Sequence, residues 1–194
     1  MKKTITTLLT LTMAASLAGC GSKPADRPTK SQGTVIESAV DFYTEVWDAF
    51  GEDRQFAAVG GDAENEAEAP AKFAMTDENK EIFEYLLHVN DELYDMLDDD
   101  TATLQHMMNT NTFSSAFAKL KDTSKAEEFA EDYKAEIQGQ HWMCGFPDKV
   151  VVISVADYVM MAYGAEECVD DLVEACSEVA PDSTVLVDAP AVLD

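Results

Sequence analysis

The segment that decides the fold is VVVISVADYVMMAY, residues 150–163. Its β-branched and aromatic residues favour strands, and Ala156-Asp157 divides it near the middle. We therefore predict a β-hairpin in which residues 150–155 pair with residues 158–163.

The segments on either side of this hairpin predict further regular elements. Upstream, residues 110–121 interleave polar and apolar side chains, which is a strand pattern, and residues 124–138 repeat apolar side chains every four residues, which is a helix pattern. Downstream, residues 165–179 predict a second helix, and residues 184–187 predict an edge strand.

The first half of the domain is predicted to be mainly helical. Residues 34–50 carry apolar side chains at helical spacing, and Thr34 with Glu37 forms a capping box. Residues 51–76 predict an irregular connection. The smaller predicted elements are a short strand over 56–59, a turn at Gly60-Gly61-Asp62, a helix from Thr76, a turn or two over 90–97 and a short helix over 101–108.

This order of elements predicts an α+β fold. We expect an antiparallel sheet with helices packed on one face. It forms a single domain over residues 34–188, with a C-terminal tail over residues 189–194. The side chains predicted to be buried are Trp47, Phe129, Tyr133, Val151, Ile153 and Leu172.

The N-terminus has the pattern of a bacterial lipoprotein signal peptide. Residues 1–19 begin with two lysines and a short apolar segment, and Leu17-Ala18-Gly19-Cys20 looks like a lipobox. Cleavage before Cys20 leaves a diacylglycerol on its sulfur, and two acyl chains give stable attachment to a bilayer. The alternative is an ordinary secretory signal with a chance cysteine.

The lipidated Cys20 and the residues after it predict a flexible tether over residues 20–33, because this segment is rich in Gly, Ser, Pro and Lys. Together with the signal peptide, it predicts a protein at the cell membrane. The domain is then lipid-anchored on the extracytoplasmic face, with the bilayer as its first partner.

Composition and charge exclude several classes of protein. The chain has 38 acidic and 13 basic residues, a net charge of −25 and a pI near 4.1. Such a surface repels phosphate backbones, so we expect no nucleic-acid partner. The apolar segment of the signal peptide is too short for a membrane span.

Three cysteines remain besides Cys20. Cys168 and Cys176 share one predicted helix and lie roughly 12 Å apart, too far for a disulfide. A disulfide from Cys144 to one of them, a reactive Cys144, and buried inert thiols all stay open. The sequence has no CxxC, phosphate-binding loop, GxSxG or HExxH, so we assign no catalytic residue and no cofactor.

The stretch QHWMCGFP, residues 140–147, gathers aromatic, sulfur and turn residues directly before the hairpin. One interpretation is an exposed recognition loop. A second is a soft metal site built from His141, Met143 and Cys144. The third, which we favour, is a tight turn that places Trp142 and Phe146 in the core.

A second unusual stretch is QHMMNTNT, residues 105–112. His106 with Met107 and Met108 suggests copper(I) ligands, but adjacent methionines do not easily face one ion, and we favour packing in the core. The acidic run at residues 98–100 lacks the spacing of a calcium loop, so we interpret it as a solvated charge run. We therefore assign no metal site.

We predict that these two stretches lie next to each other, because each precedes or enters a predicted strand and consecutive strands are often neighbours. The prediction places the Cα atoms of Asn111 and Trp142 within about 20 Å, twice the sheet-packing distance. The cluster is either a ligand pocket or a buried polar network. Its candidate residues are His106, Asn109, Asn111, Trp142 and Cys144.

Several motifs resemble a family of small lipoproteins from anaerobic gut clostridia, some of which are labelled bacteriocin transport accessory protein. The resemblance covers about residues 34–176 and the lipobox, and it implies localisation and a single α+β domain. It supplies no catalytic residues. The motifs that carry it are Gly60-Gly61-Asp62, Asp99-Asp100, residues 106–113 and residues 142–148.

Three functions follow from these features as hypotheses. The first is a non-enzymatic binding or interaction module whose partner is an unknown protein or small molecule. The second is a thiol-dependent redox or accessory protein that uses Cys144 with His141. The third is a metal-handling lipoprotein.

Overall fold

The computed structural model describes residues 33–108, 112–143 and 145–193, and its central feature is a long β-hairpin. Strands β5 (Lys149–Val155) and β6 (Tyr158–Gly164) pair antiparallel along their whole length. Ala156 takes a positive φ of 50° in the two-residue turn between them. The predicted hairpin is therefore confirmed, with each strand one residue longer than expected.

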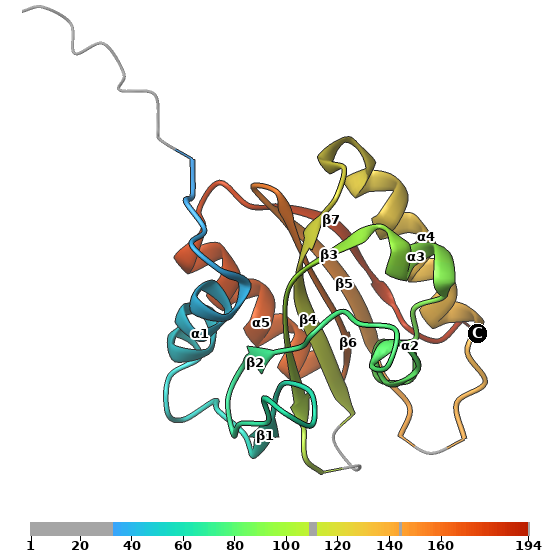
Figure 1. Cartoon of the computed structure of the whole chain (residues 1–194). Helices are drawn as coiled ribbons and strands as arrows, with labels where there is room; N and C mark the ends of the chain where they lie inside the picture. Colours follow the sequence, from blue (N-terminus) through green and yellow to red (C-terminus); the bar gives the residue numbers. More distant parts are fainter. Residues whose placement is uncertain (1–32, 109–111, 144, 194) are drawn as a thin grey trace, which may run out of the picture. The chain divides into compact units, whose positions relative to one another are not determined.

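This hairpin lies inside a seven-stranded antiparallel sheet of order β1-β3-β4-β6-β5-β7, in which β2 also pairs with β3 (Figure 1). The predicted strand after residue 110 and the predicted edge strand are both present. The other strands are β1 (Ala58–Val59), β2 (Ala71–Lys72), β3 (Leu97–His106), β4 (Phe113–Leu120) and β7 (Thr184–Pro190).

Helices cover both faces of this sheet. Figure 1 shows α1 (Ala39–Ala49) and α5 (Glu166–Val179) on one side, and α2 (Lys80–Leu87), α3 (Asp91–Asp95) and α4 (Ala126–Gly139) on the other. A short 3₁₀ turn, Thr123–Lys125, leads into α4. The α+β class, the antiparallel sheet and the single domain are confirmed, whereas the expectation that helices pack on one face is wrong.

The alternation of the central strands explains why two helical layers are needed. Val151 and Ile153 belong to the core under α1 and α5, whereas Val150 and Val152 belong to the core under α2, α3 and α4. All four side chains are fully buried, so each face of β5 needs a cover. The six side chains predicted to be buried are all buried: Trp47, Phe129, Tyr133, Val151, Ile153 and Leu172.

Strand β3 replaces the short helix that we expected over residues 101–108. Its buried Thr101 and Thr103 are β-branched, and β2 and β4 pair with it over this stretch. The register shifts between Leu97 and Thr101, so the acidic run at residues 98–100 occupies an irregularity at the start of the strand. Tertiary pairing thus overrides a short and ambiguous local pattern.

Helix α1 begins later than the capping box predicted. Its N-cap is Ser38, whose Oγ accepts a hydrogen bond from the Asp41 backbone N–H at 3.1 Å. Thr34 lies outside the helix, where its backbone N–H donates to Asp182 Oδ2 at 2.9 Å. The true cap uses the same chemistry four residues downstream.

The C-terminal end of the domain extends past the predicted boundary at residue 188. Strand β7 continues to Pro190, and the side chain of Ala191 is fully buried against α4-side residues of the core. The first residues of the predicted tail therefore belong to the sheet. No helix within the described residues is both long and apolar enough to cross a membrane.

Candidate functional site

The two unusual stretches of the sequence meet at one cleft. His106 at the end of β3 and Trp142 in the loop after α4 both line an open cavity of about 550 Å³. This volume is in the range of ligand pockets, about 300–1,000 Å³. Cys20, Asn109, Asn111 and Cys144 lie outside the described residues, so the Asn111–Trp142 distance stays a prediction.

The strand pairing explains why these stretches meet. Gln105 of β3 pairs with Ser114 of β4, and Phe113 of β4 pairs with Gly164 of β6. These three strands therefore meet their loops at the same end of the sheet. The Thr112 carbonyl also accepts a hydrogen bond from the Ala165 N–H at 2.7 Å. The loops at this end of the sheet form the cleft.

Three rings in mutual contact form one wall of the cleft. The His88 ring lies edge-on to Trp142, with ring centres 4.9 Å apart, and 5.3 Å from Tyr163. The Trp142 and Tyr163 rings are 5.4 Å apart. Tyr163 Oη donates to the Leu86 carbonyl at 2.9 Å. Burial raises the pKa of Tyr163 to about 12, so its hydroxyl stays protonated at neutral pH.

All three histidines of the chain line this cleft, namely His88, His106 and His141. His106 stacks on Phe56 with ring centres 4.6 Å apart, and its Nδ1 accepts from the Met108 backbone N–H at 2.9 Å. Burial lowers the pKa of His88 and of His106, so both imidazoles are neutral at pH 7.

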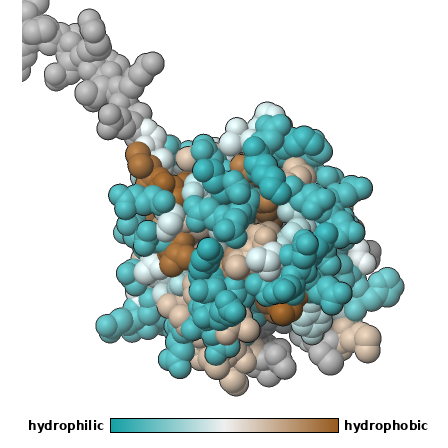
Figure 2. All heavy atoms as spheres, in the orientation of Figure 1, coloured by the Kyte–Doolittle hydropathy of each residue, from teal (hydrophilic) through white to brown (hydrophobic). Residues whose placement is uncertain are grey.

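The lining of the cleft carries no Asp, Glu, Lys or Arg among the described residues, although charged residues make up 26% of the chain. Its rim is apolar and exposed: Tyr85 on α2 is 77% exposed, Met143 is 88% exposed, and Met108 is 56% exposed. Figure 2 shows that hydrophilic residues cover most of the visible surface. The cleft is therefore a neutral region on a strongly acidic domain.

One polar group of the cleft wall has no partner in the described structure. Trp142 Nε1 is buried and makes no hydrogen bond, although buried indole N–H groups usually find an acceptor. A ligand or solvent acceptor is needed to satisfy this donor.

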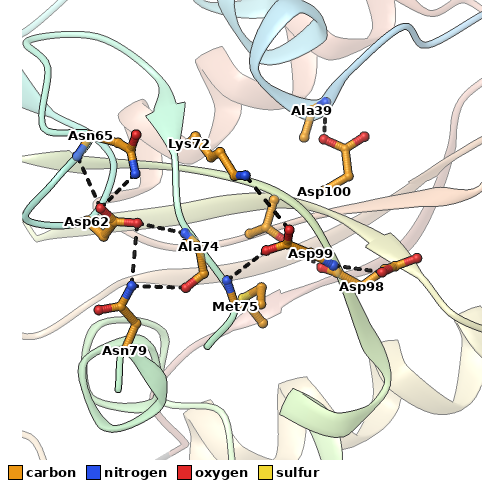
Figure 3. A network of polar contacts seen from close by, with 11 residues as sticks. Ala39, Asp62, Asn65, Lys72, Ala74, Met75, Asn79, Asp98, Asp99 and Asp100 are labelled. Carbon is orange, nitrogen blue, oxygen red and sulfur yellow. Dashed lines mark hydrogen bonds and ion pairs between the residues drawn. The ribbon is translucent and has the colours of Figure 1, made fainter. Parts of the chain in front are cut away.

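A second polar cluster, shown in Figure 3, surrounds Asp62. Its buried carboxylate accepts hydrogen bonds from the Ala74 N–H at 2.7 Å, the Glu64 N–H at 2.9 Å and the Asn65 side-chain amide at 2.8 Å. These bonds lower the pKa of Asp62 in opposition to desolvation, the largest single influence, which raises it. The cluster holds the loop between β1 and α2 and is structural.

The acidic run at residues 98–100 is structural in the same way. Asp100 accepts from the Ala39 N–H at 3.0 Å, in the first turn of α1, and from Tyr158 Oη at 2.5 Å. Asp99 accepts from the Met75 N–H at 3.1 Å, as Figure 3 shows. Asp98 and Asp99 are exposed, as a solvated run predicts, whereas Asp100 is half-buried, so the prediction is wrong for Asp100. Asp100 fastens α1 to β3, and Asp99 fastens the segment after β2 to β3.

Two of the cysteines can be assessed. Cys168 and Cys176 are both free in the described structure, and neither lies in the cleft. Burial raises the pKa of Cys176 to about 12 and also raises the pKa of Cys168, which makes both thiols poor nucleophiles at neutral pH.

The described residues do not support the metal-binding hypotheses. No group of three or more His, Cys, Asp or Glu side chains within residues 33–108, 112–143 and 145–193 is placed to hold an ion. His106 uses Nδ1 for the Met108 backbone, and Met107 and Met108 are exposed, so the core packing that we favoured for this stretch is wrong for both methionines. The same expectation is wrong for Phe146, which is 66% exposed.

Sequence reasoning missed His88, Tyr163 and Tyr85 as members of the site. His88 follows α2 with a positive φ of 53°, which turns the chain out of the helix. The available signal was the scarcity of histidine, since all three copies fall in the one cleft. Comparisons with protein families, curated proteins and solved structures give no significant match for this chain.

Proposed function

We propose that the protein is a lipid-anchored, extracytoplasmic binding module and that its ligand occupies the cleft lined by His106 and Trp142. The observation that carries this proposal is the neutral, aromatic and methionine-rich lining of the cleft on an otherwise acidic domain. Exposed apolar patches with polar surroundings mark interaction sites, and methionine side chains adapt to varied apolar partners.

The chemistry of the lining favours binding over catalysis. Three histidines and Ser114 line the cleft, but among the described residues no carboxylate lines it to orient an imidazole or share its proton. His106 uses Nδ1 to accept a backbone hydrogen bond, which leaves only Nε2 to face a ligand. The groups present can hold a ligand by stacking and by a few hydrogen bonds.

The attachment point of the tether supports an outward-facing site. Thr34, the second residue described, is held by Asp182 just before β7. Thr184 pairs with Ser154 near the end of β5, whereas the cleft lies at the Lys149 end of that strand. These ends are about 20 Å apart at roughly 3.3 Å per residue, so Thr34 and the cleft are at opposite ends of the sheet.

The proposal can be tested with a small neutral probe, para-cresol, and the two indole N–H signals of the protein in nitrogen-15 NMR. Trp142 lines the cleft, and Trp47 is a buried residue of α1 that does not line it, so Trp47 is an internal control. We expect para-cresol to shift the Trp142 signal in a saturable way and to leave Trp47 unchanged. An unmoved Trp142 signal, or equal shifts of both, would contradict the proposal.

A further inference from the structure

The basic side chains of the domain are already engaged. Eight lysines and arginines lie in the described residues, and six of them make ion pairs: Arg54, Lys72, Lys80, Lys125, Lys134 and Lys149. Lys119 lies over the Tyr158 ring, and Lys121 donates to the Asp95 carbonyl. None of the eight lines the cleft, so the described site offers an anionic ligand no free cation.

Acidic groups neighbour residues that line the cleft. On α2, Glu81 is exposed one helical turn before the rim residue Tyr85, on the same helix face. At the start of α5, Glu166 is exposed and directly follows Ala165, which bonds to Thr112 of the cleft. Asp148 accepts from the Glu166 backbone N–H at 3.2 Å. A ligand that enters the cleft therefore approaches through a negative potential.

The interior of the cleft suits a ligand that carries both apolar side chains and uncharged polar groups. Its lining combines aromatic rings and two methionines with the uncharged polar side chains of Gln105, Ser114 and Gln140. It also contains one buried donor, Trp142 Nε1, without an acceptor. A hard cation such as Ca²⁺ or Mg²⁺ gains little from such a lining, because hard cations need oxygen ligands and no carboxylate among the described residues lines the cleft. A peptide supplies apolar side chains together with carbonyl acceptors.

We propose that the cleft binds a cationic peptide segment, whose apolar side chains enter the neutral cleft while its lysines or arginines lie against the acidic surface at Glu81, Asp148 and Glu166. This inference rests on the proposed function, since it names the ligand of the same site. Charge complementarity sets the approach and the selectivity. The buried aromatic and methionine contacts hold the peptide.

The test uses the full chain held in phosphatidylcholine vesicles and three short peptides with blocked ends. The first alternates phenylalanine with lysine, the second replaces lysine with glutamine, and the third replaces it with glutamate. Binding is measured by isothermal titration calorimetry, with protein-free vesicles as the blank. We expect the lysine peptide to bind roughly tenfold or more tightly than the glutamine peptide, and the glutamate peptide to bind weakest.

Salt separates the electrostatic contribution from the apolar one. Between about 0.05 M and about 0.5 M NaCl, screening should lower the affinity for the lysine peptide several-fold and leave the affinity for the glutamine peptide nearly unchanged. Equal affinities for the three peptides, with binding in the cleft, would overturn the cationic ligand and leave the proposed function intact. Binding of no peptide, with para-cresol still shifting Trp142, would overturn the peptide and again spare the cleft.

Two matched pairs of variants locate the interaction. Tyr85→Ala removes a rim side chain, and Ile82→Ala removes an exposed apolar side chain of the same helix that does not line the cleft. Glu166→Gln and Glu178→Gln remove one charge from opposite ends of α5. We expect Tyr85→Ala to weaken binding of the lysine peptide roughly tenfold. Glu166→Gln should weaken its binding about two- to threefold. Both control variants should bind it nearly as tightly as the wild type. Equal effects of a variant and its control would overturn the proposed site.

Discussion

At the scale of single residues, the chain uses its polar side chains for two separate tasks. Asp62, Asp99 and Asp100 accept backbone or side-chain hydrogen bonds: Asp62 holds the loop between β1 and α2, and Asp99 and Asp100 hold neighbouring segments against β3. His106 and Trp142 line the cleft instead. The first task needs no ligand, because the donors that bond to these carboxylates belong to the chain itself. The second leaves rings, thioethers and an indole N–H open to a partner.

The residue-scale account predicts that Gly60 tolerates no side chain. A Cβ there would lie 2.3 Å from the Ala69 carbonyl oxygen and 2.4 Å from the Thr103 carbonyl oxygen, both backbone atoms. Gly60→Ala should lower the free energy of unfolding by about 1–3 kcal/mol. The control is Gly139→Ala, which meets nothing within 4 Å. Urea denaturation of both variants is the measurement, and equal stabilities would contradict the close approach.

The cleft histidines predict how stability depends on pH. Burial lowers the pKa of His88 and His106 below the ordinary value of 6.5, so between the two values the unfolded chain binds more protons than the folded one. Stability from this source is complete above about pH 6.5 and decreases as the pH falls through the lowered pKa values.

Urea denaturation at pH 7.5 and pH 5.5 tests this dependence, with the wild type expected to be less stable at the lower pH. The variant His88→Asn keeps a residue that tolerates the positive φ of this position and removes the imidazole. Its loss of stability between the two pH values should be smaller than that of the wild type. An equal or larger loss in His88→Asn would contradict the assignment.

At the scale of elements, the sequence predicts what is long and regular. The β5–β6 hairpin, α4 and α5 each carry a sustained period, and each is present near the expected residues. Strands β1 and β2 have two residues each, too few for any periodic signal. The second helical layer was readable in principle, because Val150–Ile153 is continuously apolar and strands buried on both faces have that pattern.

The site was predictable only in part for a related reason. Periodicity places an element, but the cleft is assembled by strand order and by the loop ends of separate elements. His106 and Trp142 could be predicted as candidate site residues, because both lie in stretches of unusual sequence. Tyr163 lies inside the hairpin and His88 ends a helix, and no local pattern connects them. Only the sheet, which pairs β4 with both β3 and β6, brings these positions together.

The account of β3 predicts that Asp100 is the important carboxylate of the acidic run. Its carboxylate accepts from the Ala39 N–H of α1 and from Tyr158 Oη, whereas in the described structure the Asp98 carboxylate accepts only from the N–H of its neighbour Asp99. Asp100→Ala leaves two donors without a partner and should cost about 1–3 kcal/mol. Asp98→Ala is the matched control and should stay close to wild type. Thermal denaturation compares them, and a larger loss in Asp98→Ala would contradict this account.

At the scale of the whole molecule, Thr34, which lies close in sequence to the proposed tether, and the cleft are at opposite ends of one sheet. Thr34 is fastened by Asp182 at the β7 start, and the cleft lies where β3, β4 and β6 meet their loops. A tethered domain with this layout can present the cleft away from the bilayer. Its acidic surface disfavours anionic lipid headgroups and favours cationic partners.

The anchor itself is tested by Cys20→Ala in cells that process lipoproteins. We expect the variant to leave the membrane fraction or to remain unprocessed, because it lacks the sulfur that carries the diacylglycerol. Membrane fractionation with mass spectrometry of the mature protein is the measurement. A variant that still sediments with membranes at the same mature mass would contradict lipidation at Cys20.

The most direct test of the central claim is the emission of Trp142 during titration with the phenylalanine–lysine peptide. Trp47→Phe leaves Trp142 as the only tryptophan of the chain. Urea denaturation of this variant first establishes that it is folded. The account predicts a saturable shift of Trp142 emission whose midpoint matches the calorimetric affinity, and Tyr85→Ala moves both together. Calorimetric binding with unchanged Trp142 emission would show that the peptide binds elsewhere and would contradict the account.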